Sequence, residues 1–178
     1  MTVSASFDEC NVIPVVSFIG HHNAGKTRLL VRLVETLSER GIRTGAVKHA
    51  PQLELADPPG TDSHQLREAG ARRMLLLGNS SAMLTWPQHS IAGIEEEIER
   101  LFSDCDIVLV EGLKQGPFPK IEVFRRTGQI PQEPLAGTID VIAVVSEAAI
   151  ALPDGTPRFS PRDREGIADF IETLFLSE

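Results

Sequence analysis

A run of eight residues near the beginning of the chain has the composition of a phosphate-binding loop. It consists of Gly20, His21, His22, Asn23, Ala24, Gly25, Lys26 and Thr27, and it fits the pattern G-x-x-x-x-G-K-[ST]. The glycines let the backbone curl so that successive N–H groups point at phosphate oxygens, and the helix that follows adds partial positive charge. A lysine at this position reaches the β- and γ-phosphates, and the threonine hydroxyl binds Mg²⁺. The run predicts a nucleoside triphosphate site. A structural turn in a pure interaction module is the alternative, which the intact Lys26–Thr27 pair disfavours.

Three histidines lie close to this chemistry. His21 and His22 occupy the variable part of the loop, and His49 follows a second apolar segment. The two loop histidines can contact phosphate, bind a metal together with His49, or face solvent while only their backbone binds. The last interpretation requires no further partner and is the one favoured here.

A phosphate loop also needs an acidic partner for the metal, at the carboxyl end of a neighbouring strand. The apolar segment 107–110 carries Asp106 at one end and Glu111 at the other, about 16 Å apart at the rise of a strand. Because ligands gather at the carboxyl ends of parallel strands, Glu111 is predicted to face Mg²⁺ or water, and Asp106 to cap the preceding turn. Asp62, at the end of a long proline-containing loop, either reaches the metal as part of a switch-like segment or caps a short helix.

Several cations follow apolar segments that are predicted to end at the same sheet edge. Each alone fits a surface charge, but together they suggest an anion pocket in an acidic protein. They are Lys48, with His49 beside it, Lys114 and Lys120.

Apolar runs alternate with amphipathic patterns from residue 13 onward, which predicts a three-layer α/β fold of the P-loop NTPase type. We expect a largely parallel sheet with helices on both faces. Residues 1–12 are predicted to form a flexible arm, and 13–178 a single nucleotide-binding domain. Strands are expected at 13–19, 42–48, 72–77, 82–86, 107–110, 121–124 and 141–145, and helices at 26–40, 62–70, 91–102 and 164–176.

Composition excludes several classes of function. The chain has 178 residues, 17 Lys and Arg, 25 Asp and Glu, and a net charge of −8, which argues against general nucleic-acid binding. No apolar run approaches the ~20 residues that span a bilayer, and the first dozen residues lack a basic signal-peptide start, so we expect a cytoplasmic protein without membrane contact. The two cysteines, Cys10 and Cys105, have neither disulfide-framework nor metal-ligand spacing.

Taken together, these segments resemble the MobB family, the molybdopterin-guanine dinucleotide biosynthesis protein B family, over nearly the whole chain. The phosphate loop alone would indicate only a superfamily, whereas the further segments are much more specific. The resemblance is carried by residues 20–27, 47–49, 59–63 (PGTDS), 69–71, 106–114 (DIVLVEGLK), 119–123 (PKIEV) and 164–170.

The resemblance implies a GTP-binding adaptor in molybdenum cofactor maturation, usually dimeric, with hydrolysis slow at most. Its implied partners are the molybdenum cofactor guanylyltransferase, molybdopterin or its guanine dinucleotide, and a second copy of the chain. By position, residues 20–27 would hold the phosphates of GTP, and Lys48, His49, Lys114 and Lys120 would line the pocket. Asp62 and Glu111 would lie near Mg²⁺, with Thr27, and would act in any hydrolysis.

The phosphate loop departs from the family in two ways. His21, His22 and Ala24 stand where the family usually has small residues such as Ser and Gly, which narrows the loop mouth. Arg28, counted here among the nucleotide contacts, stands where the family commonly has a second Thr.

The identity of the nucleotide base is the feature that the sequence determines least. The chain contains no N-K-x-D stretch, and Val144–Glu147 is the candidate base-side loop, with a carboxylate able to accept from guanine N1 and N2. The residues alone fit ATP nearly as well, so the preference for GTP comes from the resemblance. The alternative function is an ATP-dependent small-molecule kinase. A kinase would need an arginine-rich lid over the phosphates, and the loop 50–61 contains no Arg or Lys, which disfavours this alternative.

Overall fold

The computed structural model describes residues 13–53, 58–87, 90–126 and 133–177. The predicted arm, residues 1–12, lies outside them. The chain divides into two compact units, one containing the segments up to His49 and from Glu95 onward, the other Ala50–Ile94. That residues 13–178 form a single domain stays a prediction.

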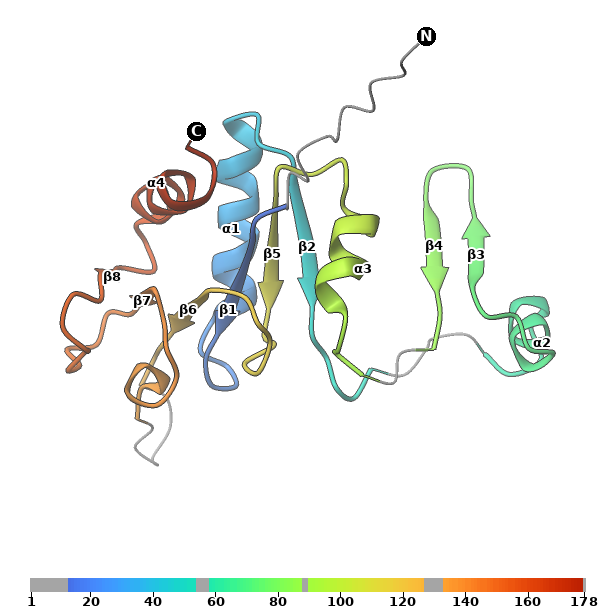
Figure 1. The fold of residues 1–178 in the computed structure, drawn as a ribbon, viewed down its shortest axis with the longest axis horizontal. Helices are drawn as coiled ribbons and strands as arrows, with labels where there is room; N and C mark the ends of the chain where they lie inside the picture. Colours follow the sequence, from blue (N-terminus) through green and yellow to red (C-terminus); the bar gives the residue numbers. More distant parts are fainter. Residues whose placement is uncertain (1–12, 54–57, 88–89, 127–132, 178) are drawn as a thin grey trace, which may run out of the picture. The chain divides into compact units, whose positions relative to one another are not determined.

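The larger unit is built on a six-stranded sheet in which every neighbouring pair is parallel. The strand order is β2-β5-β1-β6-β7-β8, so β1 lies inside the sheet between β5 and β6 (Figure 1). Non-sequential neighbours require crossover connections, which place the loops that follow the strands at one edge. The strands are β1 (Val15–Ile19), β2 (Thr44–Lys48), β5 (Ile107–Glu111), β6 (Lys120–Val123), β7 (Ala143–Val145) and β8 (Arg158–Phe159).

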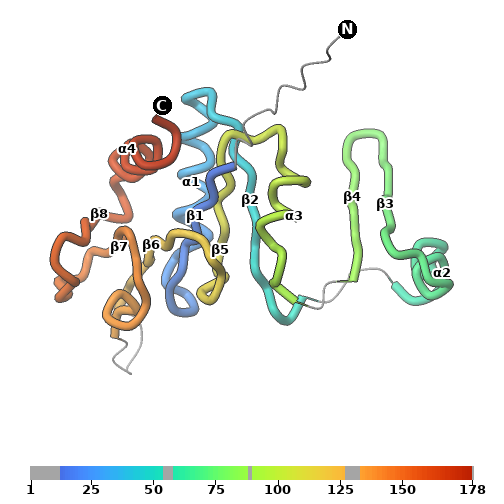
Figure 2. Tube along the Cα trace, viewed as in Figure 1, coloured from blue at the N-terminus to red at the C-terminus, as the bar shows by residue number. Residues whose placement is uncertain are grey.

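Helices cover both faces of this sheet, as predicted. α1 (Lys26–Glu39) and α4 (Arg164–Phe175) lie next to each other (Figure 2). Their apolar side chains pack with Val16 and Phe18 of β1 in one core. On the opposite face, α3 (Ile94–Leu101) is followed by Phe102, whose ring lies against Gly45 of β2. The central strands are buried on both faces, which explains why they are continuously apolar in the sequence.

A buried carboxylate anchors the segment that follows β6. Glu122 is fully buried, and its two oxygens accept hydrogen bonds from the backbone N–H groups of Leu135, at 2.7 Å, and Ala136, at 2.9 Å. These residues form η1 (Leu135–Gly137), a short 3-10 helix. Neither η1 nor the two-residue strand β8 was predicted, because such short elements carry no hydrophobic period.

The smaller unit contains α2 (Asp62–Glu68) and an antiparallel hairpin of β3 (Met74–Leu77) and β4 (Ala82–Thr85). The helix begins as expected, but its cap is Thr61, whose Oγ1 accepts from the backbone N–H of His64 at 3.3 Å. The prediction that Asp62 caps this helix is therefore wrong by one residue. No helix in the described part of the chain is long and apolar enough to cross a membrane.

Candidate functional site: a phosphate loop and an arginine-lined cavity

The loop between β1 and α1 has the backbone of an anion-binding loop. Gly20, Asn23 and Gly25 all have positive φ, at 149°, 59° and 98°. At Gly20 a side chain is also excluded by space, since a Cβ would collide with the carbonyl oxygen of Val123 on the adjacent strand. The glycine therefore satisfies both an unusual dihedral angle and a close approach of two backbones.

Lys26 is held over this loop by the loop's own carbonyls. Its Nζ donates to the carbonyl oxygen of His21 at 2.8 Å and to that of Gly20 at 3.3 Å. The pKa of Lys26 is lowered, chiefly by burial, with Lys114 and Lys48 acting in the same direction and Glu111 opposing them. Two further cations are therefore near enough to act electrostatically on Lys26, and an anion placed among them would relieve their repulsion.

Thr27 and Glu111 meet where β5 ends beside the start of α1. The Thr27 hydroxyl lies 2.8 Å and 2.9 Å from the two carboxylate oxygens of Glu111, to which it donates. Lys48, at the end of β2, has its Nζ 3.5 Å from Glu111 Oε2, and the backbone N–H of His49 donates to the Glu111 carbonyl at 2.9 Å. The start of α1 and the ends of β5 and β2 thus bring a hydroxyl, a carboxylate and an ammonium together.

This donor set fits Mg²⁺. Magnesium is usually bound by one or two protein oxygens together with phosphates and water, rather than by a cage of side chains. A hydroxyl and a half-buried carboxylate beside a phosphate loop supply those oxygens. Among the described residues, no three His, Cys, Asp or Glu side chains come together as a metal site. The interpretation that the loop histidines bind a metal with His49 therefore has no support from such a cluster in this part of the chain.

Asp106 lies at the opposite end of β5 and has a structural role. Its carboxylate accepts from the backbone N–H of Arg43 at 2.7 Å and from the Arg43 guanidinium at 3.1 Å and 3.2 Å. These hydrogen bonds lower the pKa of Asp106 to about 2. The sequence favoured Glu111 over Asp106 as the residue that faces Mg²⁺, and Glu111 is the carboxylate that lies beside Thr27.

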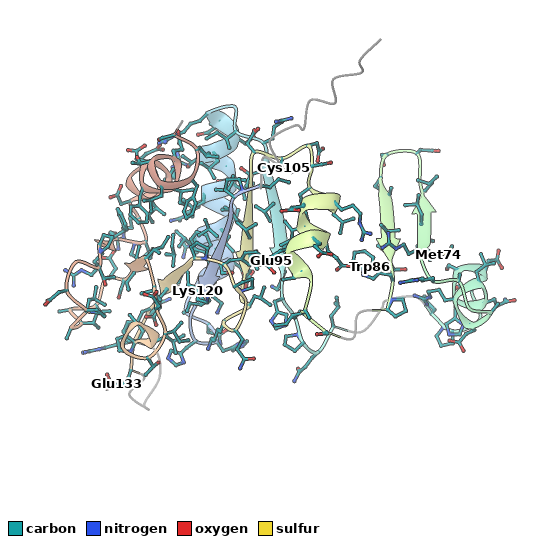
Figure 3. The ribbon with its side chains drawn as sticks, viewed as in Figure 1. Met74, Trp86, Glu95, Cys105, Lys120 and Glu133 are labelled. Carbon is teal, nitrogen blue, oxygen red and sulfur yellow. The ribbon has the colours of Figure 1, made fainter. Side chains whose placement is uncertain are left out.

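The remaining candidates divide into two groups. Lys114 is near enough to affect the pKa of Lys26, and His22, Asn23 and Arg28 are exposed on or beside the loop. Lys120, in contrast, directs its ammonium at the carbonyls of Gly116, at 2.9 Å, and Phe118, at 2.8 Å, and so fastens its own loop (Figure 3).

Two other candidates have locations that the sequence did not foresee. His21 has its Nε2 3.0 Å from the carbonyl oxygen of Glu133, so its ring contacts the segment before η1. Asp62 opens α2 in the smaller unit, whereas the phosphate loop belongs to the larger one.

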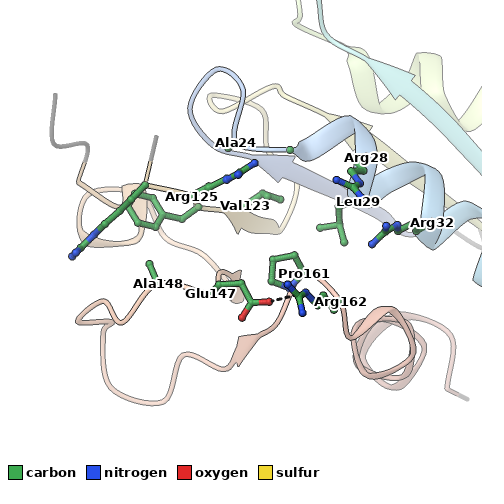
Figure 4. A pocket seen from close by; sticks show the side chains of 13 residues that line it. Ala24, Arg28, Leu29, Arg32, Val123, Arg125, Glu147, Ala148, Pro161 and Arg162 are labelled. Carbon is green, nitrogen blue, oxygen red and sulfur yellow. Dashed lines mark ion pairs between the residues drawn. The ribbon is translucent and has the colours of Figure 1, made fainter. Parts of the chain in front are cut away.

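A second feature of the larger unit escaped the sequence analysis. A cavity of about 610 Å³ opens beside the loop, on the side of β1 where β6, β7 and β8 lie (Figure 4). The spacing of Arg28 and Arg32 on one helix face, and the Arg125–Arg126 pair after a strand, were the available signals. The cavity is lined by Ala24, Gly25, Arg28, Leu29, Arg32, Val123, Phe124, Arg125, Arg126, Glu147, Ala148, Pro161 and Arg162.

Glu147, the carboxylate of the candidate base-side loop, lines this cavity. Its Oε1 accepts from the hydroxyl of Ser160 at 2.9 Å and lies 3.7 Å from Nε of Arg162. The candidate base-side loop is therefore adjacent to the phosphate loop, with its carboxylate paired to a neighbouring arginine.

A parallel sheet with β1 in its interior, followed by a glycine loop and a helix, and faced by a carboxylate from β5, defines a P-loop-type α/β protein. Comparison with known sequences makes this specific. The chain belongs to the MobB family, described as molybdopterin guanine dinucleotide synthesis protein B, which matches residues 15–147.

Individual relatives agree with this assignment. The chain is similar to the molybdopterin-guanine dinucleotide biosynthesis adapter protein of Escherichia coli K12, with 35% identity over 168 residues, covering 90% of this chain and 92% of that protein. It is also similar to a probable adapter protein of the same description from Bacillus subtilis 168, with 30% identity over 166 residues, covering 89% and 91%.

Solved structures show the same fold. Bacillus subtilis MobB superposes with a TM-score of 0.67 at 24% identity, covering 93% of this chain and all of that one. The MobB homologue from Bacillus stearothermophilus gives 0.65 at 23% identity, covering 92% and 99%.

Proposed function

We propose that this chain is an adapter in molybdopterin-guanine dinucleotide biosynthesis that works by binding GTP·Mg²⁺ at residues 20–27. The observation that carries the proposal is the contact of Thr27 with Glu111 beside the Lys26 ammonium. The adapter role is that of the family and of relatives that share about a third of the sequence. The nucleotide and the metal are inferred from the side chains themselves.

Each side chain has a defined task in this proposal. The positive-φ loop presents backbone N–H groups, and Lys26 exchanges the carbonyls of Gly20 and His21 for phosphate oxygens. Thr27 and Glu111 hold the cation, which when bound neutralises charge on the phosphates. Lys48 and Lys114 add positive charge from neighbouring strand ends.

The proposal assigns little hydrolysis to the isolated chain. The Glu111 carboxylate is occupied by Thr27 and Lys48, which suits it to the cation rather than to activating water. Rapid P-loop hydrolysis also requires a residue that positions water and an arginine at the transferred phosphate. We therefore expect the isolated protein to turn over GTP slowly, so that multiple rapid turnovers without a partner would contradict the adapter assignment.

Calorimetry with GTP and ATP, with and without Mg²⁺, tests the nucleotide site. We expect magnesium-dependent binding that prefers GTP and a loss of at least tenfold in affinity in Lys26→Ala. Arg100→Gln, a change of an exposed arginine on α3, is the control and should bind like the wild type. Equal or tighter ATP binding would reject GTP as the ligand, and unchanged binding in Lys26→Ala would reject the loop as the site.

The partner enzyme is proposed to be the guanylyltransferase that joins GMP to molybdopterin. An adapter that carries GTP has a use only where the nucleotide is consumed, and the family description names that product. Purified guanylyltransferase should co-elute with the GTP·Mg²⁺-loaded chain. If the wild-type chain does not co-elute with the guanylyltransferase in any nucleotide state, the proposal of this partner is contradicted.

A homodimer is proposed through the hairpin of the smaller unit. The edges of β6 near Ile121 cannot form the interface, because β6 is paired on both sides and Ile121 is fully buried. The hairpin instead exposes Leu77 at 77% and Met83 at 62%, and a two-stranded hairpin is marginally stable alone in water. A second copy would cover these side chains and extend the hairpin edges.

Sedimentation of wild type and of Leu77→Lys/Met83→Lys tests the dimer. We expect a dimer that the double substitution converts to monomer without loss of GTP binding. A wild-type monomer at micromolar concentration would contradict the proposal, as would a double variant that stays dimeric.

A further inference from the structure

The four lysines of the chain all belong to segments around the phosphate loop. Lys26 belongs to the loop itself, Lys48 ends β2, and Lys114 and Lys120 lie in and directly after the segment that leads from β5 to β6. We call this segment, residues 112–119, the crossing loop. Because β1 lies between β5 and β6 in the sheet, the crossing loop passes over β1, the strand that leads into the phosphate loop (Figure 1).

The crossing loop contains a β-turn in which Lys114 is the second residue. The backbone N–H of Gly116 donates to the carbonyl of Leu113 at 2.9 Å, which closes the four-residue turn 113–116. Leu113 has a φ of 59°, a left-handed conformation that is unusual for a leucine, and its side chain is buried. Gly116 lies so close to this side chain that an added Cβ would come within 2.7 Å of it. The turn is therefore held in a defined and strained conformation, which proteins retain mainly at functional sites.

Lys120 holds this turn from the far end of the crossing loop. Its ammonium donates to the carbonyl of Gly116 at 2.9 Å and to that of Phe118 at 2.8 Å. Hydrogen bonds from a charged donor are stronger than those between neutral groups. Since Gly116 is the residue that closes the turn, Lys120 fixes the turn by fixing Gly116.

Lys114 lies close enough to the phosphate loop to contact a bound anion. It follows Glu111 by three residues, so its Cα lies at most about 11 Å from that of Glu111, whose carboxylate accepts from Thr27. The Lys114 side chain is exposed, and no carboxylate in the described part of the chain lies within ion-pair distance of it. The lowering of the pKa of Lys26 by Lys114 agrees with a short distance between the two ammonium groups.

We propose that Lys120 is a positioning residue of the phosphate site, which clamps the turn 113–116 so that Lys114 meets the bound triphosphate. The proposal rests on the proposed function, since it concerns the same phosphates. It differs from the expectation that both lysines line the pocket, because Lys114 alone would contact the ligand. A lysine on a turn that is already ordered loses less freedom on binding than one on an unconstrained loop, which favours affinity.

Calorimetry on two double-mutant cycles tests whether Lys120 acts through Lys114. The ligands are GTP and inorganic triphosphate, each with Mg²⁺, so that phosphate binding is measured apart from recognition of the base. We expect Lys114→Gln and Lys120→Gln each to weaken binding by about fivefold or more, and the double variant to bind no more weakly than Lys114→Gln alone. In the control cycle, Lys48→Gln and Lys120→Gln should have additive effects, since Lys48 comes from β2 and not from the crossing loop.

Acetylation of the lysines, measured by mass spectrometry, gives a second readout that a general loss of stability would not reproduce. In the wild type, bound triphosphate should protect Lys26 and Lys114 and leave the reactivity of Lys120 unchanged. In Lys120→Gln it should still protect Lys26 but no longer Lys114. Thermal unfolding verifies that each variant is folded, and the wild-type pattern tests the proposal even if a variant is not.

The proposal is overturned by additive effects of Lys114→Gln and Lys120→Gln, by protection of Lys120 in the wild type, or by protection of Lys114 that survives in Lys120→Gln. If the wild type binds inorganic triphosphate with the expected coupling but does not bind GTP, the proposed function fails and the positioning role stands. If GTP binds without this coupling, the positioning role fails and the proposed function stands. Binding of neither ligand would overturn both.

Discussion

At the scale of single residues, the phosphate loop combines one strict steric requirement with one exchangeable set of hydrogen bonds. Gly20 is fixed by its dihedral angle and by the Val123 carbonyl, whereas Lys26 and Thr27 are held by partners that a ligand can replace. The loop geometry is therefore built by the fold before any ligand arrives. This is the condition for binding phosphate without a large cost of ordering the loop.

Gly20→Ala is expected to destabilise the protein by on the order of 3 kcal/mol, because it combines strain at positive φ with a backbone collision. Gly41→Ala provides the control, since its φ is +80° but the space around it is open, so only about 1 kcal/mol of strain is expected. Urea unfolding measures both. Equal costs for the two variants would contradict the role assigned to the Val123 carbonyl.

Asp106→Asn is expected to lower the unfolding temperature at pH 7, and to lower it much less near pH 2. The native pKa of about 2 lies below the ordinary 3.8, so the stabilisation by Arg43 is present above the unfolded pKa. It is lost as the pH falls through that interval toward 2. Thermal unfolding of both proteins from pH 7 to pH 2 measures this difference, and a difference that stays constant over the whole range would contradict the prediction.

At the scale of elements, the site results from strand order. Because β1 lies between β5 and β6, the loop that follows it meets Glu111 on one side and the arginines after β6 on the other. An ion-pair cluster between two helices stabilises this arrangement. Arg40, at the end of α1, binds Glu165, Asp169 and Glu172 on one face of α4, at 2.5, 2.7 and 2.5 Å.

Arg40→Gln is expected to lower the free energy of unfolding by about 1 kcal/mol, since three carboxylates on one face of α4 would lose their shared cation, with solvent screening limiting the loss. The loss should shrink in 1 M salt, which screens exposed charges. Arg100→Gln, which removes only a pair with Glu97 on the same helix, should change stability little. A salt-independent loss in Arg40→Gln would indicate packing rather than charge.

The elements that position the loop were predictable because they are long and strongly patterned. Lys26–Glu39 and Ile107–Glu111 match the predicted helix and strand to within a residue, and the choice of Glu111 followed from strand direction alone. The arginine pairs were visible in the sequence, but their convergence on one cavity was not, because Arg32, Arg125 and Arg162 are far apart in the sequence and meet only through the order β6-β7-β8. Lys120 begins a strand instead of ending one, which the sequence did not reveal, and its ammonium is directed at its own loop, so its place in the pocket stays a prediction.

At the scale of the whole molecule, charge is distributed unevenly in an acidic protein. Lysines surround the phosphate loop on one side of β1 and arginines line the cavity on the other, while the total is −8. Some of the acidic side chains lie away from both groups, on α4 and at Asp106, where they pair with Arg40 and Arg43 and stabilise the fold. Such a distribution suits a carrier of phosphorylated small molecules and not a nucleic-acid binder.

The central claim is that Glu111 completes a GTP·Mg²⁺ site, and the most direct test is the magnesium dependence of GTP binding in Glu111→Gln. Asp106→Asn, at the other end of the same strand, is the matched control. Calorimetry should show that Mg²⁺ tightens GTP binding at least tenfold in wild type and in Asp106→Asn, and has almost no effect in Glu111→Gln. Equal magnesium dependence in Glu111→Gln and wild type would contradict the account.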